Sequence, residues 1–275
     1  DAPLRLVHGE SLRARPGLEL AGDEAALDAD FEYIFEGWFN AGFLELRRID
    51  WDTSASVLER VIRYEAVHSI ESWDDLRARV QPADRRCYGF FHPRLPDEPL
   101  IFVEVALVDA LADSITPLLD ESADASDLGA ATTAIFYSIS NTQTGLRGVS
   151  FGDSLIKRVV ETLKAEFPRL KTFATLSPIP GFRTWLGKNA EAMIEQLDDK
   201  ARAELGRAVG FEPVTATHLL SAAERALDLD GKSPVRHMLL QCAAQYLGHE
   251  LVDGKPLDAV ARFHLGNGAR IERLN

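Results

Sequence analysis

Residues 134–182 constrain the fold of this chain more than any other segment. The run 134–140 has the β-branched and aromatic content of a strand that is buried on both faces. A glycine-punctuated turn follows, and then a helix whose apolar residues recur at three- and four-residue spacing until Pro168. Residues 170–177 predict a second strand. The segment therefore indicates a strand–turn–helix–strand unit, with its helix lying against the sheet that holds both strands.

The turn between the first strand and the helix is a candidate anion site. Backbone N–H groups at the N-terminus of a helix point toward a bound anion, which is usually a phosphate. The candidate residues are consecutive: Arg147, Gly148, Val149, Ser150, Phe151, Gly152 and Asp153. The turn lacks the Gly-Lys-Ser/Thr of nucleotide-triphosphate loops, and its glycines miss the dinucleotide-binding spacing. The alternative is that the glycines serve chain geometry alone.

The acidic composition limits the partners of the chain. A formal net charge of −13 disfavours nucleic acids and anionic membranes, because neutralising phosphates requires a basic surface. The sequence has no apolar run of about 18 residues, so we expect no membrane span. A polyanionic ligand would need a local basic patch, for which Arg147, Lys157 and Arg158 are candidates unless they are simply solvated. The two cysteines, Cys87 and Cys242, lack metal or disulfide spacing, which favours a reducing compartment.

Strands and helices also alternate on both sides of the central unit. Before it we expect helices at 31–42, 54–61, 72–80 and 110–121, and strands at 43–51, 86–91 and 100–107, the last two joined by a proline-rich loop. After it we expect helices at 190–209 and 218–227, and a third with Ser233 as N-cap and Gly248 past its end.

The end of the chain carries a strong hairpin signal. Asn267-Gly268 lies between the runs 260–265 and 269–274, and Asn-Gly between alternating runs is typical of a two-residue β-turn. We therefore expect two closing strands. Together with the central unit they predict an α/β (α+β) fold with a mixed sheet flanked by helices.

The motifs of the chain resemble those of a known family. Arg147-Gly-x-x-x-Gly152 before an amphipathic helix is similar to the coenzyme A pyrophosphate loop of GNAT-type acetyltransferases, with Ser150 where many members have glycine. The longer strings resemble the malonyl-CoA decarboxylase family, and the match runs from about residue 35 to the end. They are Phe136-Tyr-Ser-Ile-Ser-x-Thr-Gln-x-Gly-Leu-x-Gly-Val149, Leu155-Ile-Lys-Arg-Val-Val160, Leu176-Ser-Pro-Ile-Pro-Gly-Phe182 and Phe263-His-Leu-x-Asn-Gly-Ala269.

This resemblance implies a GNAT-like splayed sheet and a division into domains. Residues 1–43 would be the C-terminal end of a helical N-terminal domain, and 44–275 a catalytic domain with a helical insertion at about 183–250. Compared with the family, we expect the chain to be cut at both ends. The family further implies a homo-oligomer (dimer or tetramer) in the cytoplasm, or in mitochondria or peroxisomes if the source is eukaryotic.

Two residues match the catalytic positions of the family. Ser177 lies at the C-terminal end of a predicted strand, and His264 lies in the predicted strand beside the Gly-Asn-Gly turn. From the residues alone, both are more often structural. Ser138 and Ser140 share a strand face and either contact substrate or pair within the sheet. Glu104, a charged residue in a predicted strand, is expected to face solvent.

The implied reaction is decarboxylation of malonyl-CoA to acetyl-CoA and CO₂ through a thioester enolate. The thioester serves as the electron sink, so no metal or organic cofactor is expected. His264 would be the donor to the thioester oxygen or the proton source, and Ser177 would orient the carboxylate or relay the proton. Two other interpretations stay open: an acyl-CoA-dependent N-acyltransferase and a non-catalytic acyl-CoA-binding module.

Overall fold

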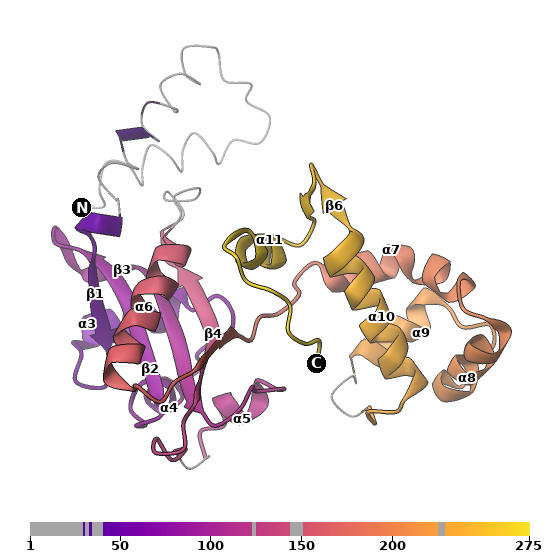
Figure 1. The fold of residues 1–275 in the computed structure, drawn as a ribbon, viewed down its shortest axis with the longest axis horizontal. Coiled ribbons are helices and arrows are strands. Elements are labelled where there is room, and N and C mark those ends of the chain that lie inside the picture. The colour runs from indigo at the N-terminus through magenta and orange to yellow at the C-terminus, as the bar shows by residue number, and fades with distance from the viewer. Residues whose placement is uncertain (1–29, 31–32, 35–40, 123–124, 144–150, 225–228) are drawn as a thin grey trace. The chain divides into compact units, whose positions relative to one another are not determined.

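The computed structural model forms two compact units, one ending at Leu176 and the other spanning Ser177–Asn275 (Figure 1). The residues that the structure describes are 30, 33–34, 41–122, 125–143, 151–224 and 229–275. The expected helix at 31–42 therefore lies mostly outside them, and a short 3₁₀ turn, Ala41–Phe43, leads into the first unit.

A five-stranded mixed sheet forms the centre of the first unit. Its strands are β1 (Glu45–Ile49), β2 (Arg85–His92), β3 (Leu95–Val108), β4 (Thr133–Asn141) and β5 (Thr172–Thr175), and they lie side by side in that order. The first four are antiparallel, whereas β4 and β5 are parallel because the helix α6 (Gly152–Glu166) connects them. The mixed sheet flanked by helices is thus confirmed.

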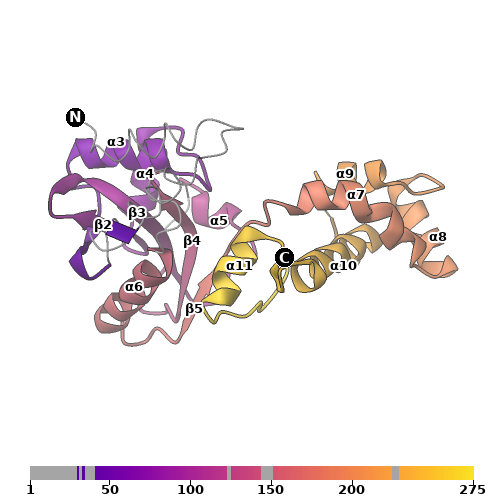
Figure 2. The same cartoon turned by 90° about the horizontal axis from the view of Figure 1, so that it is seen from above.

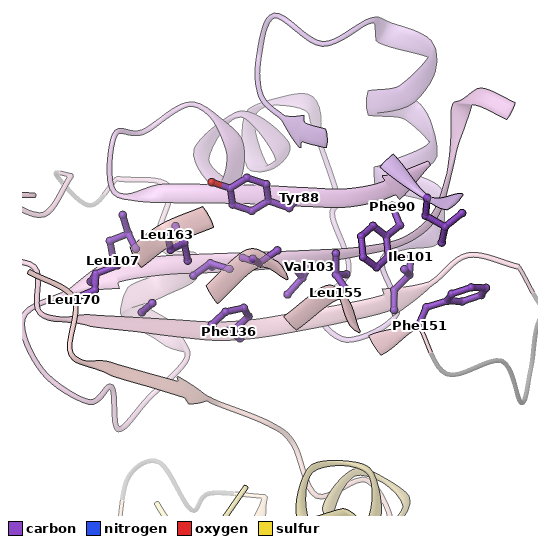
Figure 3. Close-up of a cluster of buried hydrophobic side chains, with 14 of the residues drawn as sticks. Tyr88, Phe90, Ile101, Val103, Leu107, Phe136, Phe151, Leu155, Leu163 and Leu170 are labelled. Atoms are coloured by element: carbon purple, nitrogen blue, oxygen red, sulfur yellow. The ribbon is translucent and has the colours of Figure 1, made fainter. Parts of the chain in front are cut away.

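One face of this sheet packs against α6 (Figure 3). The helix places Leu155 and Leu163, both fully buried, against large apolar side chains of the central strands. These include Tyr88, Phe90, Ile101, Val103, Leu107 and Phe136. The apolar periodicity of the sequence correctly predicted this helix, and Pro168 follows its end.

The other face is covered by α3 (Ala55–Tyr64) and α4 (Trp73–Val80) (Figure 2). Ser72 caps α4 by accepting from the backbone N–H of Asp75, and the helix agrees with the predicted range 72–80. Only Thr116–Leu119 (α5) of the expected helix 110–121 is helical. The expected loop between β2 and β3 is mostly strand, because β3 begins at Leu95 and continues through a bulge.

The parallel pairing of β4 with β5 is short. It runs from Thr133–Thr172 to Phe136–Thr175, and one further bond joins the Leu176 N–H to the Phe136 carbonyl. Beyond that point β4 continues to Asn141, paired only with β3. This is the opening between parallel strands that a splayed sheet requires.

The second unit is a helical bundle followed by a small hairpin and a final helix. Its helices are α7 (Phe182–Glu195), α8 (Asp199–Val209), α9 (Ala216–Ala223), α10 (Pro234–His249) and α11 (Ala259–Gly266). The expected single helix 190–209 is two helices, because Asp198 caps a new one at the backbone N–H of Ala201. The strands β6 (Leu251–Val252) and β7 (Lys255–Pro256) pair around Asp253 and Gly254, both at positive φ.

Candidate active site

Ser177 lies two residues after the end of β5, with Leu176 between them. Pro178 and Pro180 prevent the strand from continuing, since proline cannot donate to the ladder, and α7 begins two residues beyond Pro180. The short turn is closed by a bond from the Phe182 N–H to the Ile179 carbonyl. The two prolines make the backbone after Ser177 rigid, and Ser177 is exposed, so a ligand can reach its hydroxyl.

His264 lies on α11, which corrects the prediction of a closing β-hairpin. Asp258 starts this helix by accepting from the backbone N–H groups of Val260 and Ala261, at 3.0 and 2.9 Å. Gly268, at φ 84°, ends it: the Ala269 N–H bonds to the His264 carbonyl and the Gly268 N–H to the Leu265 carbonyl. The Asn-Gly pair is therefore a helix stop, and residues 269–275 form no strand.

The structure brings the two predicted catalytic side chains together. The Oγ of Ser177 lies 3.2 Å from Nε2 of His264, although the residues are 87 positions apart. Burial lowers the pKa of the His264 imidazole below its ordinary value, so the ring is neutral at neutral pH. A neutral imidazole has one N–H donor and one acceptor nitrogen, and the tautomer decides which of them faces Ser177.

This pair can do two things chemically. It can present a hydrogen-bond donor to an oxygen on which charge develops, and it can pass a proton between the imidazole and the hydroxyl. The pair also resembles an activated nucleophile and its base, but the sequence lacks the Gly-x-Ser-x-Gly elbow of hydrolases at Ser177.

Ser138 and Ser140 share one face of β4, as predicted, but their hydroxyls bind Glu65. Ser138 donates to the Glu65 carboxylate at 2.7 Å and Ser140 at 3.0 Å, and both serines are almost fully buried. The same carboxylate accepts the backbone N–H groups of Val67 and His68. It thus ties the segment after α3 to β4, while substrate contact by Ser138 stays a prediction.

Glu104 does not face solvent, and that prediction is wrong. Its side chain is fully buried on the α3–α4 face, paired in register with Cys87 and Ser138. Arg79 lies 3.5 Å away and is itself buried, bonded at 2.8 Å to Asp75. Burial, together with repulsion from Glu65, raises the pKa of Glu104 to about 8, so the side chain is a neutral acid at neutral pH.

The candidate anion loop lies only partly within the described residues. Arg147, Gly148, Val149 and Ser150 lie outside them, whereas Phe151, Gly152 and Asp153 open α6. Lys157 pairs with Asp153 at 2.6 Å, and Arg158 donates to the Leu44 carbonyl at 2.9 Å. Both cations of α6 are therefore engaged within their own unit, and their contact with a ligand stays a prediction.

Two important residues escaped the sequence analysis. Asp258 carried a usable signal, because an acidic residue followed by an apolar run at helical spacing predicts an N-cap. Glu65 had no such signal for its contact with β4, since Ser138 and Ser140 lie more than 70 positions away. Within the described residues, no group of three His, Cys, Asp or Glu side chains could hold a metal ion. No described helix is long and apolar enough to span a membrane.

A protein-family comparison matches residues 42–275 to the malonyl-CoA decarboxylase C-terminal domain. Two curated relatives are mitochondrial malonyl-CoA decarboxylases. The protein from Anser anser anser is 39% identical and aligns with 86% of this chain and 49% of its own length. The protein from Rattus norvegicus is 36% identical and aligns with 99% of this chain and 54% of its own length. The chain thus spans about half the length of these relatives.

Solved structures agree with this result. The malonyl-CoA decarboxylase from Agrobacterium vitis is 45% identical, with a TM-score of 0.78 over 98% of this chain and 62% of that one. The malonyl-CoA decarboxylase from Rhodopseudomonas palustris is 48% identical, with a TM-score of 0.76 over 97% of this chain and 62% of that one.

Proposed function

The chain belongs to the malonyl-CoA decarboxylase family, and from this premise we propose that it converts malonyl-CoA to acetyl-CoA and CO₂. The observation that carries the proposal is the 3.2 Å approach of Ser177 Oγ to His264 Nε2. It supports a catalytic pair, because two side chains that match the catalytic positions of the family meet at hydrogen-bond distance.

The first step breaks the bond between the malonyl carboxylate and the adjacent carbon. Its electron pair moves into a thioester enolate, and CO₂ leaves. Negative charge then develops on the thioester oxygen, where a preorganised donor is most effective. We assign that donor to the neutral His264 imidazole, since a neutral N–H stabilises the charge without giving up its proton too early.

The second step places one proton on the enolate carbon, which balances the reaction to acetyl-CoA. We assign the Ser177 hydroxyl to the carboxylate of the substrate and, after CO₂ has left, to relay of this proton. Both roles require a fixed hydroxyl, and the two prolines that follow Ser177 supply the rigid backbone. The thioester is the electron sink, so the proposal uses no metal or organic cofactor.

We assign the binding of the coenzyme A pyrophosphate to residues Arg147–Asp153. The support is that these residues precede and begin the 15-residue helix α6 in the sequence, and the first backbone N–H groups of a helix have no partner within it. A homo-oligomer and a cytoplasmic or organellar location also stay proposals, drawn from the family alone.

A product assay in D₂O tests the proposed reaction. The protein is incubated with malonyl-CoA and no amine acceptor. The acetyl-CoA product is then separated, and its mass is measured by mass spectrometry. We expect acetyl-CoA with one deuterium in its methyl group, because the enolate takes its proton from solvent. An N-acyltransferase would leave malonyl-CoA unchanged because no amine acceptor is present, and a non-catalytic binding module would also leave it unchanged. Unchanged malonyl-CoA would therefore overturn the proposal.

A further inference from the structure

The backbone of α11 is fixed by a residue whose role goes beyond capping. Asp258, 2% exposed, uses Oδ1 to hold the first turn of α11. Its other oxygen, Oδ2, accepts from the hydroxyl of Tyr246 at 3.4 Å. Burial and the nearby Asp258 raise the pKa of the Tyr246 phenol, so the hydroxyl keeps the proton that it donates.

Tyr246 also contacts the element that follows Ser177. Its ring packs against Phe182 and Trp185 of α7, with centroid distances of 6.1 and 5.6 Å. These two rings stack on one another as well, at 6.3 Å. Aromatic groups packed in this way have few alternative rotamers, so the Tyr246 hydroxyl has a defined position.

Gly181 has no side chain at the place where these contacts meet. A Cβ at Gly181 would collide with the Tyr246 hydroxyl oxygen, would lie 3.2 Å from Cζ, and would lie 3.7 Å from Asp258 Oδ2. This glycine is the last residue before α7, four positions after Ser177. Its φ of −82° suits any residue, so close approach and not backbone strain explains the glycine.

We propose that Tyr246 and Asp258 are positioning residues that hold His264 opposite Ser177, and that Gly181 gives Tyr246 the space to do so. The inference rests on the proposed function for its catalytic meaning. The chain of contacts runs from the Ser177 turn through α7 and Tyr246 to Asp258 and α11. Because a displacement of about 1 Å can cost roughly 10²-fold in rate, a support of this kind matters for catalysis.

The test compares Asp258→Ala, Asp258→Asn and Tyr246→Phe, with Asp198→Ala as the matched control. Asp198 caps α8 in the same unit by the same kind of bond, accepting from the backbone N–H of Ala201, which belongs to a different helix from His264. We expect Asp258→Ala to lower kcat at least tenfold, about 1.4 kcal/mol, with KM unchanged. Asp258→Asn should recover most of this loss, because asparagine is an equally good N-cap. Tyr246→Phe should give a smaller loss, and Asp198→Ala none.

A second readout does not depend on activity. In protein labelled with ¹⁵N-histidine, the imidazole signals of His264, assigned with His264→Asn, should move in Asp258→Ala and Tyr246→Phe and stay fixed in Asp198→Ala. If Asp258→Ala does not fold, Tyr246→Phe and Asp258→Asn carry the test. His264 signals and kcat that are unchanged in Tyr246→Phe would overturn the role of Tyr246. Equal losses of kcat in Asp258→Ala and Asp198→Ala, with unchanged His264 imidazole signals, would overturn the positioning role of Asp258.

The NMR arm also separates this inference from the proposed function. If the protein has no decarboxylase activity but the His264 signals move as expected, the proposed function fails and the positioning stands. A double-variant comparison examines Gly181. Gly181→Ala should displace the His264 signals, and adding Tyr246→Phe should partly reverse that displacement, because it removes the oxygen with which the new methyl group collides. Absence of reversal would overturn the role of Gly181.

Discussion

The buried carboxyl of Glu104 makes the stability of the first unit depend on pH, and Glu104→Gln should remove that dependence. Glu104 is fully buried, and Arg79, 3.5 Å away, is already bonded to Asp75. Burial is the larger cause of the raised pKa, about 8 in the folded state, and repulsion from Glu65 adds to it. An unfolded glutamate titrates near pH ~4.3.

The sign follows from which state binds more protons. Between about pH 4.3 and 8 the folded chain keeps the Glu104 proton, whereas the unfolded chain has lost it. Stability should therefore fall as pH rises through this window and then level off. With about 1.4 kcal/mol for each unit of pKa difference, the full loss is on the order of 4–5 kcal/mol. Glutamine is neutral at every pH and nearly the same size.

Urea unfolding at pH 5, 6, 7 and 8 checks this reasoning. We expect Glu104→Gln and wild type to have similar free energies of unfolding at pH 5. As pH rises, the variant should become progressively more stable than wild type, by several kcal/mol at pH 8 on the same scale. Glu161→Gln, an exposed residue on α6, is the matched control and should show a constant difference from wild type. A Glu104→Gln difference that is flat from pH 5 to 8, or a variant less stable than wild type at pH 8, would refute the argument.

Two further variants test the other polar features. Gly152→Val should weaken coenzyme A binding in calorimetry, because a β-branched side chain at the buried first residue of α6 would obstruct the phosphate. The control is Ala165→Val, at an exposed position of the same helix. Unchanged affinity in folded Gly152→Val would contradict the assignment of the phosphate site. Glu65→Ala should lower the free energy of unfolding by about 1–3 kcal/mol, because it leaves the hydroxyls of Ser138 and Ser140 without their acceptor. Urea unfolding measures this, and a loss no larger than that of Glu161→Ala would be evidence against the Glu65 cluster.

The sequence predicted best where the structure depends on local patterns. The strand, helix and strand of the central unit follow from periodicity and from Pro168, so their order and approximate bounds are right. The Asn-Gly pair was misread because the same residues suit both a hairpin turn and a left-handed helix end. What decides is Asp258, whose cap begins a helix ten residues before Gly268.

Contacts between segments that are distant in the sequence could not be predicted from local sequence patterns. Glu104 looked like a surface residue because the elements that bury it, and its neighbour Arg79 at 3.5 Å, are distant in the sequence. The meeting of Ser177 and His264 depends on how α11 returns to the Ser177 turn after the helical bundle, and no local pattern contains that path. The residues themselves were found only because their motifs resemble those of a known family.

We propose that Ser177 and His264 carry out decarboxylation, and turnover of malonyl-CoA by His264→Asn tests this role most directly. Removal of one preorganised donor typically costs ~10²–10³ in rate, about 3–4 kcal/mol. We predict a loss of that size in kcat with little change in coenzyme A affinity, and a comparably inactive Ser177→Ala. His249→Asn, an exposed histidine of the same unit, should retain wild-type turnover. A folded His264→Asn protein that keeps more than about half of the wild-type rate would contradict the account.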